Sequence, residues 1–150
     1  MAYLKRMIQM RRTELEAGRL NKAKMIHGFC HLYDGHESIA EGMEAVLTYD
    51  DCIITAYRDH CQAIARSDTP YRVIAEMVQK RTGSSCGKRG SMHYYNAKYN
   101  FYGGNGIVGA QVAHSKSKTA EQAAGGWTGL VKRSHEVKNR ILLNKIDILK

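Results

Sequence analysis

Four consecutive polar residues, Tyr57-Arg58-Asp59-His60, follow a short apolar segment and could bind an anionic ligand. The segment before them, Cys52–Thr55, is rich in β-branched residues and predicts a buried strand over 52–55. Side chains just past the carboxyl end of a strand lie where open α/β sheets bind ligands. A guanidinium fits phosphate oxygens, and a phenol adds a hydroxyl donor. A surface cluster in which Arg58 pairs with Asp59 explains the same residues, so position alone leaves both interpretations open.

Gly104-Asn-Gly106-Ile-Val-Gly109 has the spacing G-x-G-x-x-G, with which dinucleotide-binding proteins bring backbone amides close to a pyrophosphate. That motif needs a preceding strand, and residues 94–102 are too polar to predict a buried one. It also needs an acid about 20 residues later, whereas Glu121 is too near and Glu136 too far. A plain turn therefore explains the spacing better than a nucleotide site. Glycine still exposes the backbone, so a ligand can approach it closely.

His31 lies between Cys30 and Leu32 in an apolar patch. A single His in such surroundings is more often a structural residue than a catalytic one. The nearby acids Asp34 and Glu37 do not complete a known metal-ligand spacing. No metal site is therefore predicted.

Basic and aromatic residues are interleaved over 88–99, beginning with Lys88-Arg89 and ending with Lys98-Tyr99. Grooves for single-stranded nucleic acids combine the same two residue types. An ordered loop whose tyrosines pack against a partner subunit is the alternative. Because the net charge is +9, a basic RNA-binding or adaptor module stays open as a second class of function.

Three helices that could position these residues are predicted from capping signals and apolar spacing. The first spans 3–24, the second starts at Asp34 with a capping-box spacing to Glu37, and the third opens at Thr69-Pro70 and ends at Gly83. The expected buried faces are, in chain order, Leu4, Ile8, Leu15 and Ala17, then Ile39, Met43 and Val46, then Ile74, Met77 and Val78. A short basic helix is expected at 136–149.

The composition changes twice along the chain. Residues 83–109 hold seven of the 14 glycines and four of the nine tyrosines, and long Gly-rich loops of this kind usually serve a function. Residues 113–150 carry 8 Lys and Arg against 3 Asp and Glu, which is more than half of the net charge. We therefore expect a main part over 1–112 and a divergent basic tail over 113–150.

The overall composition is that of an average globular domain, with 150 residues of which 43% are hydrophobic and 25% charged. No apolar run approaches the ~18 residues of a membrane helix, so no membrane association is expected. The four cysteines form no Cys-x-x-Cys pair and no secretory start precedes them, so we expect reduced thiols and an intracellular protein.

Taken together, four blocks closely resemble the alpha subunit of the first component of the pyruvate dehydrogenase complex. The resemblance runs from about Tyr3 to Val112. The blocks are Gly28-Phe-Cys-His-Leu-Tyr-Asp-Gly35, Ile54-Thr-Ala-Tyr57-Arg58-Asp-His60, Gly87-Lys-Arg-Gly-Ser-Met-His93 and Phe101-Tyr-Gly-Gly-Asn-Gly-Ile-Val-Gly-Ala-Gln-Val112. Their common order makes them specific as a set.

This resemblance implies a partial thiamine-diphosphate-binding α/β fold, with N-terminal helices and a long Gly-rich loop. It implies oxidative decarboxylation of pyruvate, with transfer of the acetyl group to lipoyl groups for acetyl-CoA formation. His31 would be catalytic and would line the substrate pocket. Tyr57 and Arg58 would contact substrate and cofactor, and Gly106 and Val108 would approach the cofactor through their backbone.

The family's magnesium motif, Gly-Asp-Gly followed by Asn, does not occur in these 150 residues, and Ala113 begins a segment that departs from the family. We therefore expect a truncated member that does not decarboxylate pyruvate by itself. The resemblance further implies a beta subunit in a heterotetramer and a lipoyl-bearing acetyltransferase component. It places the protein in the mitochondrial matrix or a plastid, although no clear presequence is visible, and makes nucleic acid an unexpected partner.

Overall fold

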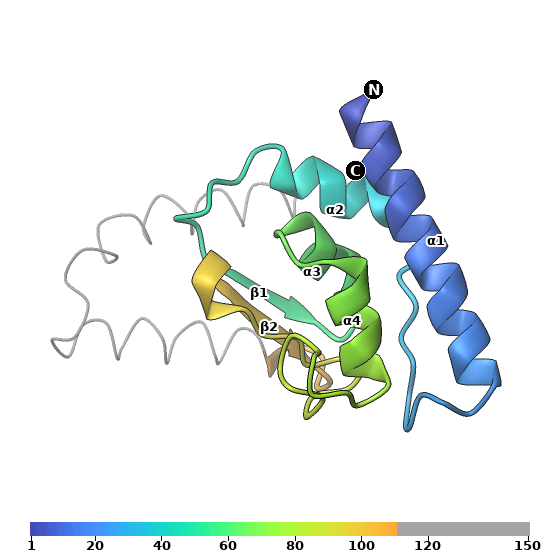
Figure 1. Cartoon of the computed structure of the whole chain (residues 1–150). Coiled ribbons are helices and arrows are strands. Elements are labelled where there is room, and N and C mark those ends of the chain that lie inside the picture. The colour runs from blue at the N-terminus through green and yellow to red at the C-terminus, as the bar shows by residue number, and fades with distance from the viewer. Residues whose placement is uncertain (111–150) are drawn as a thin grey trace, which may run out of the picture. The chain divides into compact units, whose positions relative to one another are not determined.

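The computed structural model describes residues 1–110. The expected tail over 113–150, its helix at 136–149 and the boundary after Val112 lie outside these residues. Helices and a two-stranded parallel sheet make up the described part, which confirms the expected α/β class (Figure 1). In chain order the elements are α1 (Ala2–Lys22), α2 (Glu37–Glu44), β1 (Ile53–Ala56), α3 (His60–Ala65), α4 (Pro70–Met77), the 3₁₀ helix η1 (Ala97–Tyr99) and β2 (Phe101–Asn105).

The sheet pairs β1 with β2 in parallel. Ile53 lies opposite Phe101 and Ala56 opposite Asn105, with an irregularity between Ile53 and Thr55. The predicted strand at 52–55 is thus confirmed within one residue. The second strand was missed, because glycines and polar residues hide the strand pattern around the buried Phe101.

The helices form one side of this unit. α1 packs against α2, α3 and α4, and α3 and α4 lie between α1 and the strands (Figure 1). The core that they share with the sheet includes Met10, Ile53, Val73, Tyr94 and Phe101. Among residues 1–110, no helix combines the length and the apolar character needed to cross a bilayer.

The predicted buried face of α1 is wrong. Leu4, Ile8 and Leu15 are 53%, 46% and 63% exposed, and only Ala17 of the expected face is buried. The buried residues of the helix are Met10, Thr13, Glu14, Ala17 and Leu20. Residues two apart lie about 200° apart around a helix, so Ile8 and Met10 face opposite sides. A charged residue, Glu14, occupies the buried side, and the apolar spacing therefore favours the opposite side of the helix.

The predicted start of the second helix at Asp34 is also wrong. Gly35 has φ +90°, a conformation that a right-handed helix cannot contain, and α2 begins two residues later. The Glu37 carboxylate accepts the Gly35 amide at 3.1 Å and the Arg11 guanidinium at 2.5 Å. The hydrogen bond to Arg11 is the largest cause that lowers the pKa of Glu37, and together with the bond to Gly35 it brings this pKa to about 2. Of the expected stripe, Ile39 and Val46 are exposed, and Ala40 packs in the core instead.

The Glu37 carboxylate predicts how stability depends on pH. Because its pKa is lower in the folded chain, its pair with Arg11 stabilises the fold above pH 4.5 and this stabilisation is lost as the pH falls toward about 2. Arg11→Gln is therefore expected to lower the free energy of unfolding most at pH 6 and progressively less toward pH 2. Urea unfolding across this range measures the difference. Arg12→Gln, an exposed neighbour, is the control, and a pH-independent effect of Arg11→Gln contradicts the assignment.

The third helix begins as predicted. Thr69 caps α4, its Oγ1 accepting the amide of Arg72 at 3.2 Å, and Pro70 follows in the first turn. Met77 is buried as expected, but α4 ends there and not at Gly83. Gly83 has a different role, since an added Cβ would lie 2.6 Å from the backbone of Glu76. The Glu76 carboxylate accepts three backbone amides, those of Ser85, Gly87 and Arg89, and so fixes the loop that returns toward β2.

Candidate functional site

The parallel pairing of β1 and β2 brings two separate sequence motifs to one edge of the sheet. Ala56 and Asn105 are register partners at the carboxyl ends of the two strands. Tyr57-Arg58 leaves the first strand and Gly106 leaves the second, so both chains continue from the same edge. This is the position at which parallel strands of α/β folds present ligand-binding loops.

Glycines allow β2 to lie this close to its neighbours. A Cβ on Gly104 would overlap Asp59 Oδ2 and would lie 2.6 Å from the Met92 carbonyl oxygen and 2.7 Å from that of Ala56. A Cβ on Gly106 would lie 2.8 Å from Met92 Sδ. Beyond Gly106 the backbone is open, and the side chain of Val108 is 76% exposed. The glycines with dinucleotide-like spacing thus serve two purposes. Gly104 allows close packing of the strand backbones, and the residues from Gly106 to Gly109 form an exposed turn.

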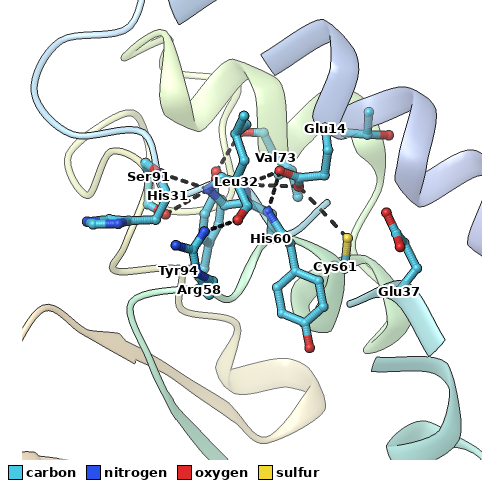
Figure 2. Close-up of polar contacts among 12 residues, drawn as sticks. Glu14, His31, Leu32, Glu37, Arg58, His60, Cys61, Val73, Ser91 and Tyr94 are labelled. Atoms are coloured by element: carbon cyan, nitrogen blue, oxygen red, sulfur yellow. Dashed lines mark hydrogen bonds and ion pairs between the residues drawn. The ribbon is translucent and has the colours of Figure 1, made fainter. Parts of the chain in front are cut away.

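Three of the predicted site residues, His31, Tyr57 and Arg58, lie against one another. The ring centroids of His31 and Tyr57 are 4.5 Å apart at an interplanar angle of 47°, and Arg58 Cζ lies 5.7 Å from the Tyr57 centroid. The Arg58 guanidinium also donates a hydrogen bond to the carbonyl oxygen of Leu32 (Figure 2). His31 and Arg58, 27 positions apart in the sequence, therefore belong to one cluster.

The surroundings of His31 favour its neutral form. Burial lowers the pKa of its imidazole, and the positive charges of Arg58 and His60 lower it further. A neutral imidazole offers one ring nitrogen as an acceptor and one as a donor. The His31 ring can therefore accept a hydrogen bond at one nitrogen and donate one at the other.

A buried polar cluster behind His31 was missed in the sequence. His60 and Glu14 are both fully buried, and His60 Nδ1 lies 2.9 Å from Glu14 Oε1. The other ring nitrogen, Nε2, lies 2.8 Å from Ser91 Oγ and 2.9 Å from the Ser91 carbonyl oxygen (Figure 2). Three distant segments supply these residues, and no local spacing links them. The one available signal was a charged residue within the helical repeat at position 14.

Asp59 is the second buried acid at this edge. Burial raises the pKa of its carboxyl well above the ordinary value, against the opposing effect of the nearby Tyr94 and Gly104 amides. Neither carboxyl oxygen has a hydrogen bond of ordinary geometry within the described residues. Asp59 is therefore a buried acid, and it does not form the surface pair with Arg58 that the sequence left open.

The arrangement can bind an anionic ligand. Arg58 is exposed at the sheet edge and supplies a cation, and the turn at Gly106 leaves its backbone bare. Residues 1–110 hold no grouping of three or more His, Cys, Asp or Glu suited to a metal ion. In the basic and aromatic stretch over 88–99, Arg89 covers the ring of Tyr95 and Lys98 that of Tyr99. Each of these cations lies over one face of its ring.

Comparison with known proteins gives one consistent family. The family model described as the dehydrogenase E1 component matches residues 5–136. The mitochondrial pyruvate dehydrogenase E1 component subunit alpha of Solanum tuberosum is 57% identical over 112 residues, which are 75% of this chain and 29% of the relative. Its counterpart in Pisum sativum is 56% identical over 75% of this chain and 28% of its own length. The counterpart in Dictyostelium discoideum is 51% identical over 73% of this chain and 29% of its own length. The chain spans less than a third of the length of these relatives.

Proposed function

The chain belongs to the dehydrogenase E1 component family, and we propose that it supplies the alpha-subunit side of a thiamine-diphosphate site for the oxidative decarboxylation of pyruvate. One observation carries this proposal. The pairing of β1 with β2 sets Tyr57-Arg58 and the Gly106 turn at one sheet edge. The relatives' names, pyruvate dehydrogenase E1 component subunit alpha, supply the substrate.

Each predicted residue has a role that follows from its chemistry. Arg58 balances the charge of the diphosphate with its guanidinium. Gly106 and Val108 approach the cofactor through backbone groups, because the turn that they form is open. When bound, thiamine diphosphate supplies the carbon nucleophile and the electron sink that a 2-oxo acid needs to lose carbon dioxide. His31, held neutral against Tyr57, faces the substrate and accepts or returns a proton at its ring nitrogen, while Tyr57 and Arg58 contact the substrate beside it.

The proposed assembly and location follow from the relatives. We propose that the chain pairs with a pyruvate dehydrogenase beta subunit in a complex that includes a lipoyl-bearing acetyltransferase component, that by itself it does not decarboxylate pyruvate, and that it is located in the mitochondrial matrix, as the mitochondrial names of the relatives suggest. The family's magnesium motif, Gly-Asp-Gly followed by Asn, does not occur in the 150 residues, so we propose no magnesium ligand in this sequence. The division into a family part over 1–112 and a basic tail over 113–150 remains part of this proposal.

Arg58→Gln is expected to weaken the binding of thiamine diphosphate by about 10- to 100-fold. The reason is the loss of a charge-assisted hydrogen bond, which contributes ~1.5–3 kcal/mol. Isothermal titration calorimetry of the full chain with thiamine diphosphate, alone and with a pyruvate dehydrogenase beta subunit, measures the change.

Arg12→Gln is the matched control, because it removes the same charge from the exposed surface of α1. Equal affinities of the two variants for thiamine diphosphate would contradict the proposed site. Single-stranded RNA that binds the chain with a log–log salt slope near −0.7 per neutralised phosphate would favour the basic RNA-binding module instead.

A further inference from the structure

The buried residues Glu14, His60 and Ser91 form one hydrogen-bonded chain. Glu14 comes from α1, His60 is the first residue of α3, and Ser91 lies in the loop before β2. Glu14 and His60 are 0% exposed and Ser91 is 4% exposed. Figure 2 shows the imidazole of His60 between the other two side chains. We call these three residues the Glu14–His60–Ser91 relay.

The acceptors around His60 determine where its protons lie. The Ser91 carbonyl oxygen, 2.9 Å from Nε2, can only accept a hydrogen bond, so this contact requires a proton on Nε2, and the Ser91 hydroxyl at 2.8 Å then accepts from the same proton. On the other side, Nδ1 lies 2.9 Å and 3.0 Å from the two Glu14 carboxylate oxygens, so a second proton lies between ring and carboxylate. Both ring nitrogens are therefore engaged. The ring cannot turn without breaking a buried hydrogen bond.

The relay holds the backbone on both sides of Leu32. The His31 amide donates to Ser91 Oγ at 3.0 Å, and the Tyr33 amide donates to Glu14 Oε2 at 2.8 Å. Between them, the Leu32 carbonyl oxygen accepts the guanidinium of Arg58. Hydrogen bonds thus fix the backbone of residues 31–33. Arg58 and His60, which supply or support these bonds, follow directly after β1 in the sequence.

Apolar side chains in place of Glu14 and His60 would bury the same surface, but they would not fix the orientation of the neighbouring backbone. Burying a carboxylate and an imidazole costs desolvation energy, and apolar residues often stabilise such positions better. Hydrogen bonds to two defined amides, by contrast, set the orientation of the backbone between them. The polar composition of this cluster therefore points to positioning and not to stability.

We propose that the Glu14–His60–Ser91 relay is a positioning device that orients His31 against Tyr57 and links this contact to Arg58. This inference rests on the proposed function, which gives His31 its role beside the substrate. The hydrogen bonds of the relay do not depend on a bound cofactor. Glu14, His60 and Ser91 are positioning residues, because they act through the backbone of residues 31–33.

Nuclear magnetic resonance of the full chain tests this proposal without a cofactor. In the unmodified chain, we expect nuclear Overhauser contacts between the His31 and Tyr57 rings and proton-bearing signals from Nε2 of His60. Ser91→Ala is expected to abolish the contacts between the two rings while the amide signals of α1 and α4 keep their positions. Thr69→Ala, which removes one side-chain hydrogen bond at the start of α4, is expected to preserve them.

Several results would overturn the proposal. Unchanged contacts between the His31 and Tyr57 rings in a folded Ser91→Ala variant would show a purely structural role. If the Ser91→Ala variant fails to fold, the proposal is tested on the unmodified chain. There, a nuclear magnetic resonance signal that shows Nε2 of His60 without a proton contradicts the relay. If Ser91→Ala loses the ring contacts and the unmodified chain does not bind thiamine diphosphate, the relay is supported and the proposed function is refuted. The two proposals can therefore fail separately.

Discussion

Replacing Arg66 by Met is expected to lower the free energy of unfolding by ~4 kcal/mol, the typical cost of removing one partner from a buried ion pair. Arg66 is 1% exposed. Its guanidinium donates to the carbonyl oxygens of Tyr99 at 2.8 Å and Thr48 at 2.7 Å, to that of Asp51, and to the Glu44 carboxylate at 3.0 Å. Met fills a similar volume but leaves all of these acceptors without their donor.

The acceptors explain why Arg66 also affects the site. Asp51 precedes β1 and Tyr99 precedes β2, so one side chain ties together the segments that lead into both strands. Burial already raises the pKa of Glu44, and the loss of Arg66 raises it further because the guanidinium opposes that shift.

Urea unfolding of the full chain measures this cost. Arg19→Met is the control, since Arg19 forms an exposed pair with Glu16 on α1 and its loss is expected to change the midpoint little. If the two variants unfold at the same urea concentration, Arg66 does not organise the fold as described.

Gly104→Ala is expected to destabilise the chain by at least ~2 kcal/mol, because an added methyl group in a tightly packed site forces the backbone to move. The methyl carbon would lie 2.6 Å from the Met92 carbonyl oxygen and 2.7 Å from the Ala56 carbonyl oxygen, and it would overlap the carboxyl of Asp59. Relief requires β2 to move away from β1. The proposed diphosphate site, which spans the ends of both strands, is then expected to lose affinity as well.

Gly42→Ala provides the matched control. Gly42 lies within α2, and no heavy atom lies within 4 Å of an added Cβ. Alanine is therefore expected to stabilise this helix by ~0.5–1 kcal/mol. Thermal unfolding followed by circular dichroism compares the two, and a Gly104→Ala variant as stable as the unmodified chain would contradict the close packing of the strands.

The sequence predicts local features of this fold better than long-range ones. β1 and the Thr69 cap of α4 are confirmed, because each depends on a few adjacent residues. β2 was missed because glycine weakens a strand pattern, and here only the contacts with Ala56 and Met92 explain why glycine is needed.

The same distinction holds for the candidate site. Tyr57-Arg58 was recognised from its position after a strand, and the structure places His31 beside it. The partnership of Glu14 with His60 joins residues 46 positions apart. A charged residue in a helix usually predicts an exposed face, and for this reason the buried side of α1 was assigned to the wrong residues.

The most direct measurement of the central claim is a titration of the isotope-labelled chain with thiamine diphosphate, followed through its backbone amide signals. We expect the amide signals of Tyr57 and Arg58 and those of Gly106 and Val108 to shift together and to saturate along one binding curve. Shifts confined to the basic and aromatic stretch over 88–99, or shifts at only one of the two strand ends, would contradict a shared diphosphate site.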